Sequence, residues 1–226
     1  MGTHFGKTIL GTFVHTMSSI KEHYNKRYRG IDENSLPPED QDTFGRRFQF
    51  ALDQLPASSQ LILDYGCGRG GAARRFSDAG HRVEAIDLSD EVIRLAQAYE
   101  PRANYTVIDS EEKLPFADQY FDQCYSSEVI EHVFDIRAYL SEIHRVVKPG
   151  GLLMLTTPYH GVAKNVTLAL RGYERHYDPY HGHIRFFTVK SLHKCLRDYG
   201  FEPKFFAGIG RFWPLYKTMF VSAVRV

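Results

Sequence analysis

Glycines at alternate positions follow a short apolar run, and this spacing suits a nucleotide-like ligand. The run LILDY (61–65) leads into Gly66, Gly68 and Gly70, and Gly71 comes directly after them. A strand that ends in a glycine turn and opens a helix surrounds a ligand with free backbone N–H groups and a positive helix end. Glycine suits such a turn because it adopts positive φ angles and leaves room for the ligand. The sequence therefore predicts a ligand site at residues 61–71.

Asp64 distinguishes between two ligands that this glycine spacing fits. Gly66, Gly68 and Gly71 match the dinucleotide pattern G-x-G-x-x-G, and Asp87 follows at about the distance expected of its ribose-binding acid. A carboxylate two residues before the first glycine would repel the pyrophosphate of a dinucleotide, whereas it would attract a ligand that carries an ammonium group. Asp64 therefore favours S-adenosylmethionine, which has an α-amino group, a sulfonium and an adenosine but no phosphate.

Polar residues also follow the later apolar runs, where the carboxyl ends of parallel strands would place them. Asp87 follows RVEAI, where it either accepts hydrogen bonds from both ribose hydroxyls or starts a helix beside Ser89, and we favour the ribose. Asp109 either accepts a hydrogen bond from the adenine amine or begins a turn. Ser127 and Glu128 follow the next run. Because ligands bind at this edge of an open parallel sheet, all of these residues are candidate contacts.

Histidines gather between residues 158 and 187, and histidine is suited to act as a base near neutral pH. Transfer of a methyl group to an oxygen acceptor benefits from a base that removes the acceptor's proton. His160 and His183 are the candidates, since His160 follows the fifth predicted strand and His183 precedes RFFT. His176 and His181 offer further imidazoles, but their spacing with His183 matches no standard metal site, so we predict no metal. We expect at least one of these histidines to line the acceptor pocket.

The pattern from residue 60 onward alternates short apolar runs with helical periodicity, and this alternation predicts the scaffold. Strands are predicted at 61–65, 82–87, 105–108, 121–126, 152–156, 201–206 and 219–226, and helices at 43–55, 70–79, 89–99, 136–147 and 188–199. The motif KPGG (148–151) predicts a stop and a sharp turn. Such repeated units predict an α/β, Rossmann-like parallel sheet with helices on both faces. The last two strands are expected to form an antiparallel hairpin.

Two segments interrupt this alternation. Residues 1–42 contain a basic-aromatic cluster and an acidic loop with two adjacent prolines. We predict an N-terminal lid or cap there, with a solvated helix face as the alternative. Residues 158–187 are rich in aromatic residues and too long for an ordinary connection. We predict that they form an acceptor-site insertion within a domain that spans 43–226, where their aromatic side chains either line the pocket or pack on the sheet.

The composition argues against several classes of protein. With 226 residues, 43% hydrophobic and 24% charged, the chain is expected to form one substantial domain. A net charge of +1 without a basic run argues against nucleic acid as a partner. No apolar stretch approaches the roughly 20 residues of a membrane span, and the N-terminus lacks a secretory pattern. Three isolated cysteines favour a cytoplasmic location. Nothing in the sequence predicts the oligomeric state.

Five stretches together resemble a known family. They are LDYGCGRG (63–70), VEAIDLSDE (83–91), VIDSEEKLPFADQYFD (107–122), SSEVIEHV (126–133) and HRVVKPGGLLMLTTP (144–158). Their order and spacing are similar to those of class I S-adenosylmethionine-dependent methyltransferases. The resemblance spans residues 40–226 and implies a seven-stranded sheet of order 3-2-1-4-5-7-6, with the last strand antiparallel.

The resemblance also implies the cofactor, S-adenosyl-L-methionine, with S-adenosyl-L-homocysteine as its product. The implied contacts lie in the glycine turn, at the ribose, beside adenine and near the methionine end. In that order they are Asp64, Gly66, Cys67 and Gly68, then Asp87, then Leu88, Asp109 and Ser110, then Ser127 or Glu128.

A narrower resemblance is to ubiquinone-pathway O-methyltransferases, through SEVIEHV (127–133) and GHIRFFTVKSL (182–192). In that branch an arginine upstream of the first motif glycine helps bind the cofactor, which implies Arg46 here. Some relatives use the positions of Glu128, Glu131 and His132, which at i, i+3 and i+4 would share a helical face, for a divalent metal. We favour the alternative that these residues tie the loop to its neighbours.

These observations predict a methyltransferase that acts on a small molecule, with oxygen as the favoured acceptor atom. Transfer to nitrogen or carbon stays open, and so does cofactor binding without catalysis. A dehydrogenase is disfavoured by Asp64 and by the lack of a Tyr-x-x-x-Lys pair near the fourth or fifth strand. The identity of the acceptor does not follow from the sequence.

Overall fold

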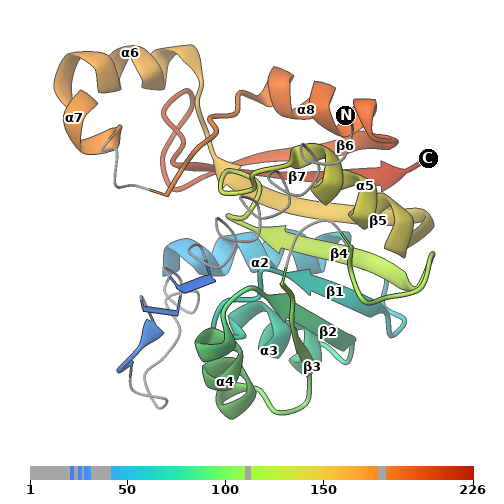
Figure 1. Cartoon of the computed structure of the whole chain (residues 1–226). Helices are drawn as coiled ribbons and strands as arrows, with labels where there is room; N and C mark the ends of the chain where they lie inside the picture. Colours follow the sequence, from blue (N-terminus) through green and yellow to red (C-terminus); the bar gives the residue numbers. More distant parts are fainter. Residues whose placement is uncertain (1–20, 23–24, 27, 32–41, 110–112, 178–181) are drawn as a thin grey trace, which may run out of the picture.

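Seven strands of the described chain form one mixed β-sheet (Figure 1). The computed structural model describes residues 21–22, 25–26, 28–31, 42–109, 113–177 and 182–226. The strand order is β3-β2-β1-β4-β5-β7-β6. Neighbouring strands are parallel except where β7 pairs with β5 and with β6. The predicted strand order and the antiparallel last strand are therefore confirmed.

Strands and helices alternate along the chain as the sequence predicted. The strands are β1 (Leu61–Tyr65), β2 (Arg82–Asp87), β3 (Asn104–Val107), β4 (Phe121–Ser127), β5 (Val147–Pro158), β6 (Phe201–Ile209) and β7 (Thr218–Arg225). The helices are α2 (Asp42–Gln54), α3 (Gly71–Asp78), α4 (Asp90–Tyr99), α5 (Ile136–Val146), α6 (Val162–Arg171), α7 (Tyr173–His176) and α8 (Val189–Asp198). Among the described residues, no helix combines the length and the apolar character that crossing a bilayer requires.

Alternate side chains of the strands divide the core into two layers. On β1, Leu61, Leu63 and Tyr65 belong to the layer that contains the buried side chains of α5 and α8. Ile62 belongs to the opposite layer, with the buried side chains of α2 and α3. A strand that is buried on both faces requires this period of two. Helices therefore cover both faces of the sheet, as Figure 1 shows.

The KPGG motif follows the end of α5 closely, as the predicted stop requires, but it is part of β5 and not a separate turn. Val147 and Leu152 both pair with β4, but their partners lie only two positions apart, so the register shifts between them. Residues 148–151 therefore bulge out of the ladder. A Cβ on Gly151 would lie 2.4 Å from the carbonyl oxygen of Asp122. Glycine thus allows a close approach at a β-bulge, a role that the turn interpretation overlooked.

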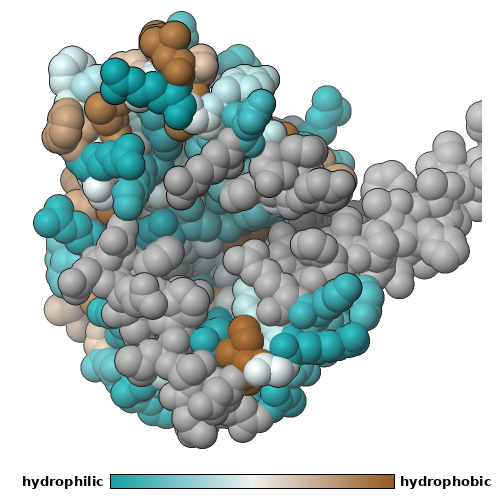
Figure 2. Space-filling model, turned by 90° about the vertical axis from the view of Figure 1, so that its left-hand side faces the viewer, coloured by the Kyte–Doolittle hydropathy of each residue, from teal (hydrophilic) through white to brown (hydrophobic). Residues whose placement is uncertain are grey.

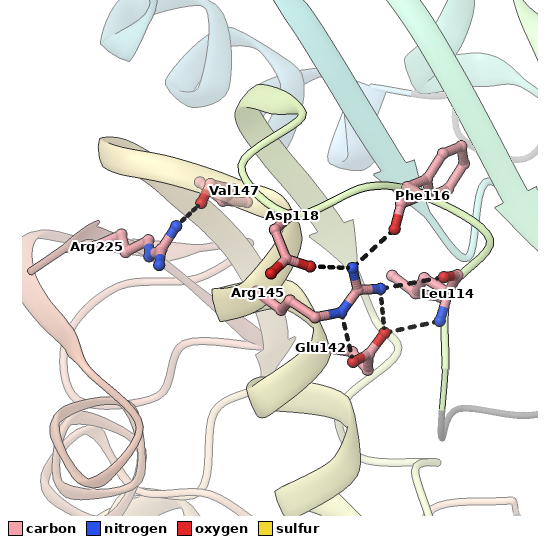
Figure 3. A network of polar contacts seen from close by, with 7 residues as sticks. All are labelled: Leu114, Phe116, Asp118, Glu142, Arg145, Val147 and Arg225. Carbon is pink, nitrogen blue, oxygen red and sulfur yellow. Dashed lines mark hydrogen bonds and ion pairs between the residues drawn. The ribbon is translucent and has the colours of Figure 1, made fainter.

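A single guanidinium fixes the segment between β3 and β4 to α5 (Figure 3). Arg145 donates hydrogen bonds to the carbonyl oxygens of Phe116 at 2.7 Å and Leu114 at 3.1 Å. It also pairs with Asp118 at 2.8 Å and with Glu142 at 2.6 Å. Glu142 in turn accepts a hydrogen bond from the Leu114 N–H at 2.8 Å. The chain that enters β4 is therefore held in place at the edge opposite to the glycine turn.

Two helices lie beyond the carboxyl end of β5, inside the predicted insertion (Figure 1). On α6, Val162, Val166 and Leu170 are 81%, 53% and 78% exposed, whereas Lys164 is buried. The apolar face of α6 therefore points outward, which reverses the usual orientation of an amphipathic helix. Figure 2, which views this side of the molecule, shows hydrophobic side chains in its upper part.

Candidate functional site

The glycine turn lies where β1 ends, in a conformation that other residues rarely adopt. Gly66, Gly68 and Gly70 have φ angles of 72°, 52° and 84°. The N–H groups of Gly66 and Cys67 donate to the carbonyl oxygen of Ile86 at 2.8 and 3.0 Å. The turn is therefore tied to the end of β2, and its shape requires glycine.

The carboxylate of Asp87 joins the glycine turn to α4. Its Oδ2 accepts a hydrogen bond from the Gly68 N–H at 3.1 Å, and its Oδ1 accepts one from the Ser89 N–H at 3.0 Å. The Ser89 hydroxyl caps α4 by accepting a hydrogen bond from the Val92 N–H. Leu88, beside Asp87, packs partly buried against the core. Asp87 thus lies at the edge where β1 and β2 end.

Asp64 is a buried acidic residue within β1. Only 2% of it is exposed, and its neighbours in the ladder are Ala85 of β2 and Tyr125 of β4. Burial raises the pKa of the Tyr105 hydroxyl, and the nearby charges of Cys67 and Asp64 raise it further. Asp64 is therefore a buried acidic side chain directly before the glycine turn, and its contact with a ligand stays a prediction.

Asp109 follows β3 and contacts the described part of the N-terminal segment. Its side chain is 93% exposed, and its Oδ1 accepts a hydrogen bond from Lys21 Nζ at 3.3 Å. Lys21 also pairs with Asp90 at 3.1 Å. Burial lowers the pKa of Lys21, but the hydrogen bonds to the two carboxylates outweigh burial and raise it overall. Ser110 lies outside the described residues.

Glu128 follows β4 in the left-handed region, with φ at 55°. Its N–H donates to the carbonyl oxygen of Thr156 at 3.0 Å, and the Thr156 hydroxyl donates to its Oε1 at 3.0 Å. The Ser127 hydroxyl lies 2.9 Å from the same Thr156 hydroxyl. One threonine of β5 therefore holds both predicted residues at the carboxyl end of β4.

Arg47, rather than the exposed Arg46, is the arginine of α2 that reaches this site. Arg47 is 6% exposed, and its Nη2 lies 3.5 Å from Glu128 Oε2 and donates to Thr218 Oγ1 at 3.2 Å. Burial raises the pKa of Glu128 although the charge of Arg47 opposes this. Sequence reasoning missed Arg47. Its spacing of one helical turn from the apolar Ala51 is the signal that could have found it.

The helical face expected for Glu128, Glu131 and His132 is wrong, because this stretch forms a turn and not a helix. Glu131 is fully buried and accepts a hydrogen bond from the Thr157 hydroxyl at 3.0 Å. Burial raises the pKa of Glu131, and the nearby Glu128 raises it further. His132 Nδ1 lies 2.7 Å from the carbonyl oxygen of Gly182, which belongs to the predicted insertion.

His183 lies against this turn. Its ring centroid is 4.8 Å from that of His132, and one ligand atom each from Glu131, His132 and His183 fall within 4.8 Å of one another. Such groups are chemically able to hold a divalent cation. The same residues also dock the insertion, since the Ile184 N–H donates to the carbonyl oxygen of Glu131 at 3.0 Å. Their role as docking contacts stays our prediction.

His160 is buried just after β5, in a separate cluster. It is 2% exposed, and its N–H donates to the carbonyl oxygen of Phe187 at 3.0 Å. Its ring centroid lies 4.8 Å from that of Phe186 and 5.3 Å from that of His176. Its Nδ1 lies 3.2 Å from Asn165 Oδ1. Burial lowers the pKa of His160 to about 4, so this imidazole is neutral near pH 7.

A buried lysine, which sequence reasoning missed, comes from α6. Lys164 is 9% exposed, and its Nζ donates to the carbonyl oxygen of Lys217 at 3.0 Å. Burial lowers the pKa of Lys164 to about 8, the charge of Arg211 adds to this shift, and Glu128 opposes it. Figure 2 looks onto this edge of the sheet, and the surface there is hollowed between the upper part, which holds α6 and α7, and the lower part.

A seven-stranded sheet with a glycine turn and an acid at its carboxyl edge is the arrangement expected of a methyltransferase domain. Residues 39–203 match a family model described as a methyltransferase domain, and the chain belongs to this family.

Curated relatives match a part of the chain. A malonyl-[acyl-carrier protein] O-methyltransferase of Erwinia pyrifoliae is 36% identical over 114 residues, which are 50% of this chain and 43% of the relative. A protein of the same name from Hamiltonella defensa is 31% identical over 144 residues, which are 63% of this chain and 54% of the relative. The chain thus spans about half the length of these curated relatives.

A solved structure matches the whole chain. It is the 1,6-didemethyltoxoflavin-N1-methyltransferase of Burkholderia thailandensis with bound 1,6-didemethyltoxoflavin and S-adenosylhomocysteine. The TM-score is 0.66 at 18% identity, and the match covers 100% of this chain and 92% of the other. A likeness at this identity shows the fold.

Proposed function

We propose that this chain is an S-adenosylmethionine-dependent methyltransferase that transfers a methyl group to oxygen of a small molecule. The observation that supports this most directly is the carboxylate of Asp87, which accepts from the N–H groups of Gly68 and Ser89. It stands at the carboxyl edge of β1 and β2, where a nucleoside binds in sheets of this kind. S-adenosylmethionine, when bound, supplies a methyl group on a sulfonium that leaves as a neutral thioether.

The residues at this edge fit the cofactor in chemical kind. Asp64 supplies negative charge for the ammonium group, and the glycines of the turn present backbone N–H groups without side chains of their own. We assign Asp87 to the ribose, and Leu88 and Asp109 to the adenine side. Ser110, Ser127 and Glu128 complete the proposed set, with Gly66, Cys67 and Gly68 in the turn. Because Arg47 is buried beside Glu128, we propose it in place of Arg46.

His160 is the proposed base for an acceptor hydroxyl. It is buried at the carboxyl end of β5, and it is neutral near pH 7 because burial lowers its pKa to about 4. A neutral imidazole can take the proton that a hydroxyl loses as its oxygen becomes methylated. His183, the other candidate from the sequence, contacts His132, and we propose that it docks the insertion.

A carboxylic acid is a second candidate acceptor, and the buried cation Lys164 favours it. The curated relatives, as malonyl-[acyl-carrier protein] O-methyltransferases, also transfer a methyl group to oxygen. A carboxylate needs no base, because it has already lost its proton at neutral pH. We place the hydroxyl acceptor first, since Lys164 already donates to the carbonyl oxygen of Lys217. The resemblance to ubiquinone-pathway enzymes stays a prediction.

Calorimetry tests the cofactor, and labelled turnover tests the acceptor. We expect S-adenosylhomocysteine to bind in the micromolar range and NADH not to bind; the reverse would overturn the proposal.

The chain is then incubated with methyl-labelled S-adenosylmethionine and a panel of phenols, carboxylic acids and amines. His160→Gln should abolish methylation of phenols and spare that of carboxylic acids, and Lys164→Met should do the opposite.

Two segments of the chain have proposed roles beside the cofactor and the acceptor. We propose that residues 1–42 act as a lid, since Lys21 already contacts Asp90 and Asp109 at the adenine side. Residues 158–187 would form the acceptor site within the domain at 43–226. The three cysteines are free, and this supports a reducing, cytoplasmic location. The sequence contains no basic run that would favour a nucleic-acid partner.

A further inference from the structure

Asn165 of α6 contacts His160 at two atoms. Its Nδ2 donates to the backbone carbonyl oxygen of His160 at 3.2 Å. Its Oδ1 lies 3.2 Å from Nδ1 of the same imidazole. Both contacts are formed by one amide group, so the position of one end of the amide determines the position of the other.

This double contact determines which imidazole nitrogen carries the proton. A backbone carbonyl oxygen only accepts hydrogen bonds, so the NH₂ end of the amide has to face it, and the amide oxygen then faces Nδ1. The amide oxygen carries no hydrogen, so the contact is a hydrogen bond only if Nδ1 carries one. A neutral imidazole has a single N–H, so the lone pair of His160 lies on Nε2.

The lone pair on Nε2 has no hydrogen-bond partner within the described part of the chain. The ring packs beside Phe186 and His176, both of which belong to the predicted acceptor-site insertion. A buried acceptor atom without a partner is unfavourable, so its presence beside a proposed acceptor site suggests a functional role. An acceptor hydroxyl that reached Nε2 would satisfy this atom.

We propose that Asn165 is a positioning residue that holds His160 in the Nδ1–H tautomer, so that Nε2 is the atom that takes the proton from the acceptor hydroxyl. The role of Nε2 toward an acceptor hydroxyl rests on the proposed function, whereas the tautomer of His160 does not. Neither the spacing of the histidines nor the comparisons point to Asn165.

The turn into α6 explains how a residue five positions later can reach back to His160. Gly161 caps the helix, and the Asn165 N–H donates to its carbonyl oxygen at 3.0 Å. A Cβ on Gly161 would lie 2.0 Å from the Tyr159 hydroxyl, so a larger residue there would displace the Tyr159 ring. The first turn of α6 then places Asn165 over the imidazole.

The charged groups around His160 act in the same direction as its burial. Lys164 on α6 and His176 on α7 both lower the pKa of His160, while the hydrogen bond with Asn165 raises it. Burial is the largest of these effects, so the ring stays neutral near pH 7. Only the neutral ring has a lone pair to offer, so these groups preserve the form that Asn165 orients.

Nitrogen NMR tests the tautomer without any turnover. Two-bond ¹H–¹⁵N correlation of the full chain, with His160→Gln for assignment, should show a protonated Nδ1 and an unprotonated Nε2 in His160. Asn165→Ala should give a mixture of tautomers, whereas Asn165→Asp should retain the wild-type pattern. Thr167→Ala is the matched control, because the Thr167 hydroxyl donates to the carbonyl oxygen of Ala163 in its own helix. A protonated Nε2 in the wild type would overturn the proposal.

Turnover separates positioning from stability. With a phenol of the panel that is methylated, Asn165→Ala should lower kcat at least tenfold and leave the KM for S-adenosylmethionine unchanged. Asn165→Asp should restore kcat and move the acidic limb of the pH profile upward, because a carboxylate beside Nδ1–H stabilises the imidazolium. An unchanged kcat in Asn165→Ala, despite a mixed tautomer, would overturn the role of Nε2. If no phenol is methylated, the proposed function fails and the spectra still decide the tautomer.

Discussion

Asp87 is the side chain whose loss should affect the cofactor most directly. Its two oxygens accept hydrogen bonds from Gly68 and Ser89, and a ribose would add a further charge-assisted contact. We expect Asp87→Ala to weaken binding of S-adenosylhomocysteine by roughly 10- to 100-fold, the equivalent of about 1.5–3 kcal/mol. Calorimetry measures this change. Asp118→Ala, which alters an acid at the opposite edge of the sheet, should leave the affinity unchanged. Equal affinities for all three proteins would contradict the ribose assignment.

Two glycines with similar φ angles allow conformation and space to be measured separately. Gly66 and Gly80 have φ angles of 72° and 86°. A Cβ on Gly66 would lie 2.4 Å from Val129 Cγ2, whereas a Cβ on Gly80 meets nothing within 4 Å. We expect Gly80→Ala to cost about 1 kcal/mol in the free energy of unfolding, and Gly66→Ala about 1–3 kcal/mol more. Urea denaturation measures both. Equal losses would contradict the close contact with Val129.

Lys164 should make stability rise with pH in the alkaline range. Burial lowers its pKa from 10.5 to about 8, so between these values the unfolded chain binds a proton that the folded chain does not. The free energy of unfolding of the wild type should therefore rise from pH 8 to pH 10.5 relative to Lys164→Met, by up to about 3 kcal/mol. Urea denaturation at several pH values measures the difference. Lys190→Met, at an exposed position, should follow the wild type, and parallel curves for Lys164→Met would contradict the shift.

At the scale of elements, α8 depends on a reciprocal cap at its first turn. The Thr188 hydroxyl accepts from the Ser191 N–H at 3.1 Å, and the Ser191 hydroxyl accepts from the Thr188 N–H at 2.9 Å. We expect Thr188→Ala to lower the free energy of unfolding by about 1 kcal/mol, and Thr188→Asn to retain most of it. Urea denaturation of the three proteins measures this. A loss in Thr188→Asn as large as in Thr188→Ala would show that the cap is not the cause.

The elements themselves could be predicted because their apolar residues repeat with the period of a strand or a helix. Prediction failed where backbone geometry overrides this local pattern. At Glu128–His132 the spacing suits a helix, but Glu128 adopts a left-handed conformation and the stretch forms a turn. At KPGG the helix α5 ends as predicted, but the glycines lie in a bulge inside β5 and not in a turn between the helix and the strand. On α6 the periodicity is present, but nothing in it shows that the apolar face is exposed.

The candidate site was predictable to the extent that one strand and its following loop build it. The glycine turn and Asp87 come from the ends of β1 and β2, so a motif reveals them. Arg47, Lys164 and Asn165 were missed because the contacts that give them a role form only when the chain folds. Arg47, for example, is distinguished from Arg46 by its contact with Glu128, which follows β4. A sequence shows neither which arginine is buried nor which carboxylate it meets.

At the scale of the whole molecule, chelation should leave the protein unchanged. Glu131, His132 and His183 already hold the insertion against the turn after β4 through direct contacts. We therefore expect dialysis against EDTA to alter neither the melting temperature nor methyl transfer. Both are measured before and after dialysis, and again after Mg²⁺, Mn²⁺ or Zn²⁺ is added. A loss that one of these ions restores would show that the cluster binds a metal.

The place of β7 in the sheet has a consequence for how the protein is made. β7 follows the other six described strands in the chain, yet it lies between β5 and β6 and pairs with both. While the ribosome is still synthesising the chain, β5 therefore has an open edge and β6 has no neighbour within the sheet. Such unpaired edges invite association with other chains, and pairings between distant segments form slowly. The sheet of a nascent chain is thus most exposed to aggregation just before β7 emerges.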